Sequence, residues 1–104
     1  MSTVPSPANI VASIGPASTV VVGANLTRMG LFVFNPSGVV IWVCPSTTNT
    51  GQAQAAVVGG AGSIPIQPQQ GLMLGGSAMP PFTNGLNAIS ASGTNPLTVW
   101  EFYA

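Results

Sequence analysis

The chain has 104 residues, the size of one ordinary domain, and hydrophobic residues make up 46% of it. Arg28 and Glu101 are its only charged residues. Disordered chains combine few apolar residues with a high net charge, so this composition predicts one folded domain. Nucleic acids and anionic membranes are bound through several basic side chains, and a single arginine excludes both as partners.

The same charge count excludes most catalytic chemistry. The chain has no His, one carboxylate and one cysteine, Cys44. General acid–base catalysis needs positioned titratable groups, a nucleophile needs an adjacent base, and a metal ion needs a cluster of His, Cys or carboxylate ligands. We therefore expect no enzymatic activity, no cofactor and no metal site, and we interpret Cys44 as a buried thiol.

The beginning of the chain is rich in proline. Pro5, Pro7 and Pro16 stand among small residues, which is typical of an extended segment. We expect residues 1–18 to form an extended N-terminal arm and residues 19–104 to form a β-sandwich domain. The N-terminus lacks the basic start and continuous apolar stretch of a secretory signal, so the sequence predicts a protein made and used in a soluble compartment.

The middle of the chain predicts a β-hairpin. Residues 29–34 and 39–44 are rich in β-branched and aromatic side chains, and the turn sequence Asn-Pro-Ser-Gly separates them at residues 35–38. Side chains alternate along a strand, so both faces of this hairpin are apolar. We expect the rest of the domain or a neighbouring subunit to cover both faces.

Further short strands follow, separated by turn signals. Residues 63–66 and 71–74 are two of them, and residues 86–91 and 97–103 form a final pair. No segment shows helical periodicity. The sequence predicts an all-β sandwich or jelly roll of six to eight short antiparallel strands.

We interpret the two charged side chains and the two tryptophans as structural. Glu101 lies among apolar residues of a strand and would favour a cationic partner, which only Arg28 can provide, so we predict a structural ion pair. Trp42 and Trp100 lie in runs that suggest central strands and are interpreted as core residues. The alternative, an aromatic face for sugars that includes Tyr103, has only scattered amides to orient a ligand.

Three segments carry a resemblance to a known family. Residues 24–38 (ANLTRMGLFVFNPSG) are similar to an A-N-x-x-R-x-x-L-x-(V/I)-x-N-x-S pattern in small virion proteins of tailed bacteriophages. Residues 64–68 resemble the family's G-x-P-L-x-P-G passage, and residues 86–103 resemble its closing pair of strands, which ends on Glu101. The chain departs from the pattern in its very low charge and in an Ala/Gly-rich loop at residues 51–62.

The resemblance implies a β-sandwich protein on the capsid exterior, assembled in the host cytoplasm, that decorates and cements the shell. Its partners would be the major capsid protein and other copies of itself, as a dimer or trimer, which suits a nearly uncharged domain. Alternatives are a receptor-binding or fibre module of the virion, a cellular surface-layer or carbohydrate-binding module, and a freely soluble monomer. The predicted subunit interface consists of Val4, Pro5, Pro7, Ile10, Met79, Pro80, Pro81 and Phe82.

Overall fold

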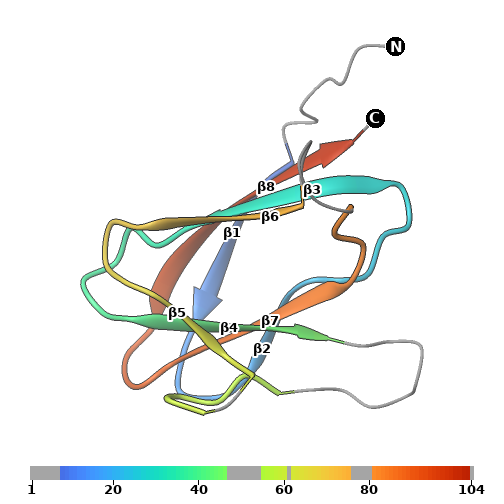
Figure 1. Cartoon of the computed structure of the whole chain (residues 1–104). Coiled ribbons are helices and arrows are strands. Elements are labelled where there is room, and N and C mark those ends of the chain that lie inside the picture. Colours follow the sequence, from blue (N-terminus) through green and yellow to red (C-terminus); the bar gives the residue numbers. More distant parts are fainter. Residues whose placement is uncertain (1–7, 47–54, 61, 76–80, 104) are drawn as a thin grey trace.

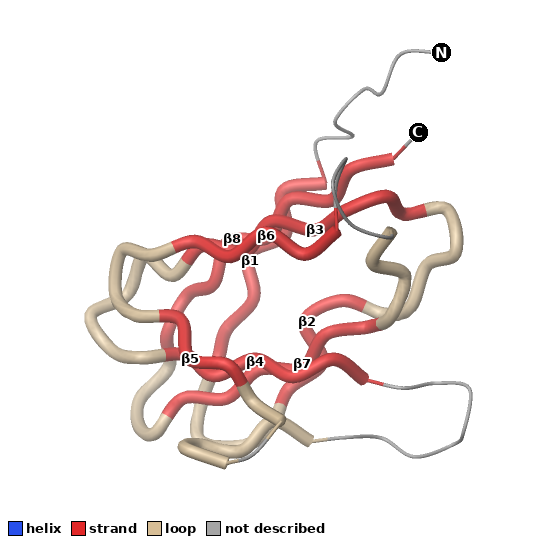
Figure 2. Tube along the Cα trace, viewed as in Figure 1, coloured by secondary structure: helices blue, strands red, loops and turns tan. Residues whose placement is uncertain are grey.

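A computed structural model describes residues 8–46, 55–60, 62–75 and 81–103. Within these residues the chain forms eight β-strands in two antiparallel sheets of four strands each, so it is a β-sandwich (Figures 1 and 2). The described part contains no helix, and so none that is long and apolar enough to span a membrane. The strands are β1 (Ala8–Ile14), β2 (Thr19–Val22), β3 (Arg28–Phe34), β4 (Ile41–Ser46), β5 (Ile64–Ile66), β6 (Gly71–Gly75), β7 (Gly85–Ser90) and β8 (Asn95–Tyr103).

The strand order places the first strand, β1, beside the last strand, β8. The first sheet has the order β1-β8-β3-β6 and the second has the order β2-β7-β4-β5. β1 pairs with β8, β2 with β7, β3 with β6, and β4 with β5. Every connection between consecutive strands crosses from one sheet to the other, except the connection between β4 and β5.

The predicted hairpin of residues 29–34 and 39–44 is therefore wrong. β3 and β4 lie in opposite sheets, and the segment that joins them crosses between the two layers. The physical reason is the side chain of Asn35, which accepts a hydrogen bond from the Ser37 amide at 2.9 Å and donates to the Ile66 carbonyl at 2.9 Å. The turn signal was thus real, but the turn is anchored to the layer opposite β3.

The same correction applies to the last two strands. β7 and β8 were expected to pair, yet β7 lies between β2 and β4 while β8 lies between β1 and β3. The segment that joins them crosses between the two layers, and Asn95 at the start of β8 stabilises it by donating to the Ser90 hydroxyl at 3.0 Å and to the Ser92 carbonyl at 2.9 Å.

The core fills the space between the sheets. Inward residues alternate with outward ones along each strand, as a half-buried sheet requires. Each fully buried Val, Leu or Ile side chain contributes roughly 1.5–3 kcal/mol relative to exposure. The core residues are Ile14, Val21, Val22, Leu31, Val33, Ile41, Val43, Ile66, Leu86, Ala88, Leu97 and Val99.

The N-terminal boundary of the sandwich differs from the expected one. β1 pairs with β8 over its whole length, from Ala8 opposite Glu101 to Ile14 opposite Asn95, and Ile14 is fully buried. Residues 8–14 thus belong to the sandwich rather than to an arm at residues 1–18. The reason is that no proline interrupts the chain between Pro7 and Pro16, so this stretch keeps the amide donors a sheet needs.

Candidate interaction site

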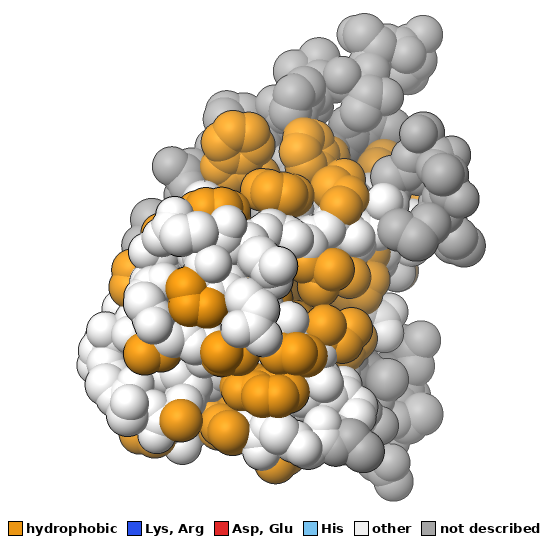
Figure 3. All heavy atoms as spheres, turned by 60° about the vertical axis from the view of Figure 1, so that its left-hand side comes forward, with side chains coloured by type: hydrophobic (Ala, Val, Ile, Leu, Met, Phe, Trp, Pro, Cys, Tyr) orange, Lys and Arg blue, Asp and Glu red, His pale blue; other side chains and the backbone are white. Residues whose placement is uncertain are grey.

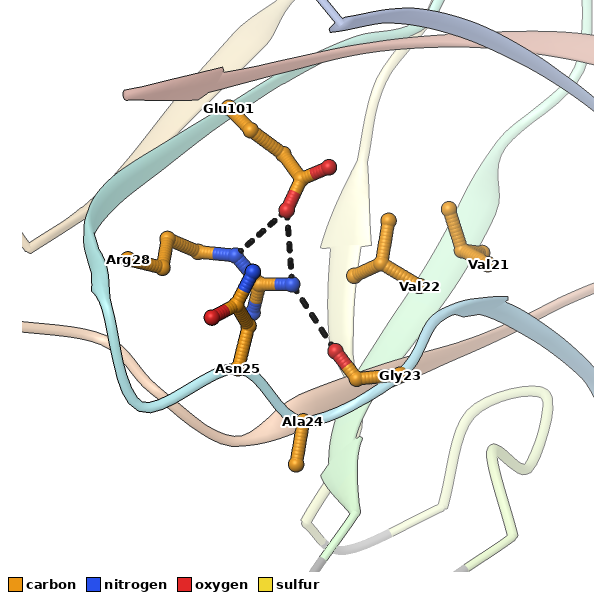
Figure 4. Close-up of a pocket in the computed structure, with 7 residues that line it drawn as sticks. All are labelled: Val21, Val22, Gly23, Ala24, Asn25, Arg28 and Glu101. Atoms are coloured by element: carbon orange, nitrogen blue, oxygen red, sulfur yellow. Dashed lines mark hydrogen bonds and ion pairs between the residues drawn. The ribbon is translucent and has the colours of Figure 1, made fainter. Parts of the chain in front are cut away.

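The two charged side chains of the protein lie together. Arg28 begins β3, and its guanidinium Nε and Nη2 lie 2.9 Å and 2.8 Å from Oε2 of Glu101 on β8 (Figure 4). Arg28 is only 2% exposed, and Glu101 is also buried. These are the two residues that the sequence predicted to pair.

The other guanidinium donors also bind protein oxygens. Nη1 of Arg28 donates to the carbonyl of Asn84 at 2.9 Å, and Nη2 donates to the carbonyl of Gly23 at 2.8 Å. Gly23 follows β2 and Asn84 precedes β7, both of the second sheet, whereas β3 and β8 belong to the first. Arg28 thus links the two layers, and each of its three guanidinium nitrogens donates a hydrogen bond within the protein.

A shallow depression of about 370 Å³ lies over this pair. Val21, Val22, Gly23, Ala24 and Asn25 line it together with the two charged residues (Figure 4). The sequence contains no further carboxylate side chain and no His that could form an acid–base pair with Glu101. The chemistry that this arrangement supports is structural: a charged crosslink beneath a small polar depression.

Burial of the pair leaves the surface of the whole protein without a charged side chain, because the sequence holds no others. Figure 3 shows one face, on which hydrophobic side chains lie among uncharged polar atoms. A surface of this kind carries little electrostatic repulsion between copies and imposes little charge desolvation on a partner.

The outer face of the first sheet carries a row of large apolar side chains. Met73 on β6, Phe32 on β3 and Trp100 on β8 are cross-strand neighbours in register, and we call them the aromatic row. The Phe32 and Trp100 rings meet edge to face, with centroids 6.5 Å apart and an interplanar angle of 61°. Met73 is 40% exposed and Trp100 is 51% exposed.

The surroundings of Phe32 fix its ring in this row. A Cβ atom at Gly71, on the neighbouring β6, would lie 2.5 Å from Cζ of Phe32, so the ring occupies the space above that glycine. Phe34 and Phe102 extend the same outer face as half-buried residues, two positions from Phe32 and from Trp100 respectively. The row is thus part of a larger apolar sheet face rather than a single exposed side chain.

The prediction that both tryptophans are core residues is wrong for Trp100 and only partly right for Trp42. Trp42 is half-buried, and its strand neighbours Ile41 and Val43 are the residues that enter the core. Alternation along β8 gives the reason, since Val99 and Glu101 face inward and Trp100 between them faces outward. The alternation along β8 is present in the sequence, but it shows that Trp100 faces outward only when one inward residue of the strand is known.

Most of the predicted interface lies outside the described residues, namely Val4, Pro5, Pro7, Met79 and Pro80. Ile10 lies in β1 opposite Val99, within the sandwich. Pro81 is exposed, whereas Phe82 is half-buried and packs against the core. Phe82 therefore supports the fold, because its contacts are made within the domain.

Comparisons with known proteins add no assignment: no protein-family model matches the chain, and no curated protein or solved structure is significantly similar to it.

Proposed function

We propose that this chain is a structural virion protein that decorates and cements a bacteriophage capsid by packing against major capsid protein subunits. The observation that carries the proposal is the outer face of the first sheet, where the aromatic row stands on a surface without side-chain charge. Cementing a shell requires a rigid domain and a broad contact surface, and it requires no chemistry.

The strand order also supports this function. The two four-stranded sheets, with the orders β1-β8-β3-β6 and β2-β7-β4-β5, form a β-sandwich, and these strand orders support our proposal that the sandwich is of the double-sheet jelly-roll type. Jelly rolls build viral capsid and lectin domains. Fold alone does not define function, but this architecture agrees with the resemblance of residues 24–38 to virion proteins.

The proposed contact works by burial of apolar area. Aromatic side chains dominate the energetics of protein interfaces, and apolar surface removed from water contributes roughly 25 cal/mol per Å² before the entropic cost of association. The edge-to-face contact with Phe32 holds Trp100 in place before binding, which reduces the side-chain entropy lost on docking. The site of action would be the capsid exterior, after assembly in the host cytoplasm.

The direct test is binding of the purified protein to capsids that lack it. We expect many copies spread over the shell, and we expect Trp100→Ala to weaken attachment by about tenfold or more, as loss of an interface hot spot does. Leu26→Ala is the matched control, because Leu26 is 90% exposed and lies in the loop between β2 and β3, away from the row. Equal attachment of the Trp100→Ala variant and the wild type would remove the aromatic row from this function.

A second candidate function is a receptor-binding or fibre module of the virion. The observation that favours it is the exposure of Trp100, since aromatic rings also stack on the apolar faces of sugars. Binding in few copies, confined to the tail, would support this module and contradict the cement function. Binding over the whole shell would do the reverse.

A further inference from the structure

The two sheets have four edge strands within the described residues: β1 and β6 in the first sheet, β2 and β5 in the second. An edge strand presents backbone N–H and C=O groups along one side and can pair with a strand of another chain. Folded proteins usually protect such edges with prolines, charges, bulges or short strands.

Three of the four edges have such protection. β5 has only three residues, and one of them is Pro65. β2 has four residues, and its pairing with β7 shifts register between Val20 and Val22. β6 has five residues and ends at Gly75, whose φ of 84° takes the backbone out of the extended region.

β1 has none of these features. It has seven residues, contains no proline and no charged residue, and pairs with β8 without a register shift. It is the longest of the four edges, and only β8 pairs with it among the described residues. Among the described residues, no strand therefore pairs with β1 on the side opposite β8, where backbone N–H and C=O groups of an edge strand point outward.

We propose that β1 pairs with β1 of a second copy of this chain, antiparallel about a two-fold axis at its middle residue, Val11. The pairing would join two four-stranded sheets into one of eight strands. A contact of this kind is isologous, because the same strand serves both partners and its antiparallel pairing closes on itself. The absence of surface charge favours a second copy as the occupant, since no like charges oppose the approach.

The proposed pairing determines where the outer faces of the two copies would lie. In an antiparallel pair, directly opposite residues point to the same side of the sheet, so the two outer faces would lie on one side of the joined sheet. The aromatic rows of both copies would then form parts of one continuous face. The dimer does not depend on the capsid function, because it is a property of the purified chain.

The test places charge at the centre of the predicted pairing. Position 11 lies opposite Thr98, which is half-buried, rather than opposite a core residue. We expect the wild type to be dimeric by sedimentation equilibrium, and Val11→Lys and Val11→Glu each to weaken association by about tenfold or more, because like charges would face each other across the axis. Mixing the two variants should restore the dimer. Thr94→Lys, in the exposed turn between β7 and β8, adds the same charge away from the edge and should leave the dimer intact.

A second variant keeps the test valid if a charge at position 11 prevents folding. Val11→Cys places two thiols opposite each other across the axis, and oxidised glutathione should link them into a covalent dimer. Val20→Cys on the β2 edge, 67% exposed in the wild type, is the matched control and should not form this dimer. A monomeric wild type, a dimer that Val11→Lys leaves unchanged, or equal crosslinking at positions 11 and 20 would each overturn the proposal.

Discussion

At the scale of single residues, two polar centres hold the ends of the sandwich. The first is the Arg28–Glu101 pair, which joins β3 to β8 and reaches the carbonyls of Gly23 and Asn84 in the other layer. The second is Asn35, which is fully buried between the β3–β4 and β5–β6 connections. Both replace apolar packing at places where the chain crosses from one sheet to the other.

Removal of one member of the ion pair should be strongly destabilising. Glu101→Gln leaves the Arg28 guanidinium buried without a counter-charge, and we expect the free energy of unfolding to fall by about 3 kcal/mol. Urea denaturation measures this change. The Arg28→Met/Glu101→Leu double variant removes both charges. We expect its loss of unfolding free energy to be smaller than the sum of the losses in the Arg28→Met and Glu101→Leu single variants. Additive losses would show that the two residues contribute independently.

Asn35 should contribute more to stability than an asparagine in a similar but exposed turn. Its Nδ2 donates to the Val39 and Ile66 carbonyls at 2.7 Å and 2.9 Å, so Asn35→Ala leaves buried acceptors without this donor. We expect a loss of about 2–3 kcal/mol in urea denaturation. The side chain of Asn25 also accepts a hydrogen bond from the amide two residues later, that of Thr27, at 3.0 Å. This bond is exposed, whereas the corresponding bond from Ser37 to Asn35 is buried. Asn25→Ala should therefore lose less than about 1 kcal/mol, and equal losses would contradict this account.

At the scale of elements, two glycines with a positive φ lie at or near the ends of strands, and they differ in how closely the backbone around them is packed. β6 ends at Gly75, where φ is 84° and the backbone of the next segment passes close by. A Cβ atom there would lie 2.7 Å from the Met29 carbonyl oxygen and 2.9 Å from the Phe82 amide nitrogen. Gly93, between β7 and β8, also has a positive φ, of 74°, but a Cβ atom there would meet only the Asn95 side chain, at 3.8 Å.

The two glycines separate the effect of backbone conformation from that of close packing. Gly93→Ala should destabilise the protein by about 1 kcal/mol, because only the left-handed conformation is strained. Gly75→Ala adds a collision with backbone atoms and should cost about 3 kcal/mol or more. Thermal and urea unfolding of the two variants would measure the difference. A Gly75→Ala variant as stable as Gly93→Ala would mean that the segment around Phe82 moves aside freely.

At the scale of the whole molecule, the dominant feature is a surface without charged side chains. Attachment to a capsid through this surface should respond little to salt, because there are no exposed side-chain ion pairs to screen. We expect the dissociation constant to change by less than about threefold between about 0.05 M and about 0.5 M NaCl. Titration of capsids at both salt concentrations would measure it. A tenfold weakening at high salt would indicate that charges at the chain ends or on the partner govern binding.

The amino-acid sequence by itself determined the class of fold, the position of most strands and the partner of each charge. These properties depend on local features: β-branched runs, turn residues such as Asn35 and Gly93, and a chain in which Arg28 and Glu101 can pair only with each other. Only the tertiary structure decided which strands lie side by side. Successive strands separated by good turn signals can either pair within a sheet or face each other across the core, and both choices satisfy the same local pattern. That choice placed Trp100 and Met73 on the outside and made β1 an edge, because the inward face of a strand is defined by the sheet that covers it.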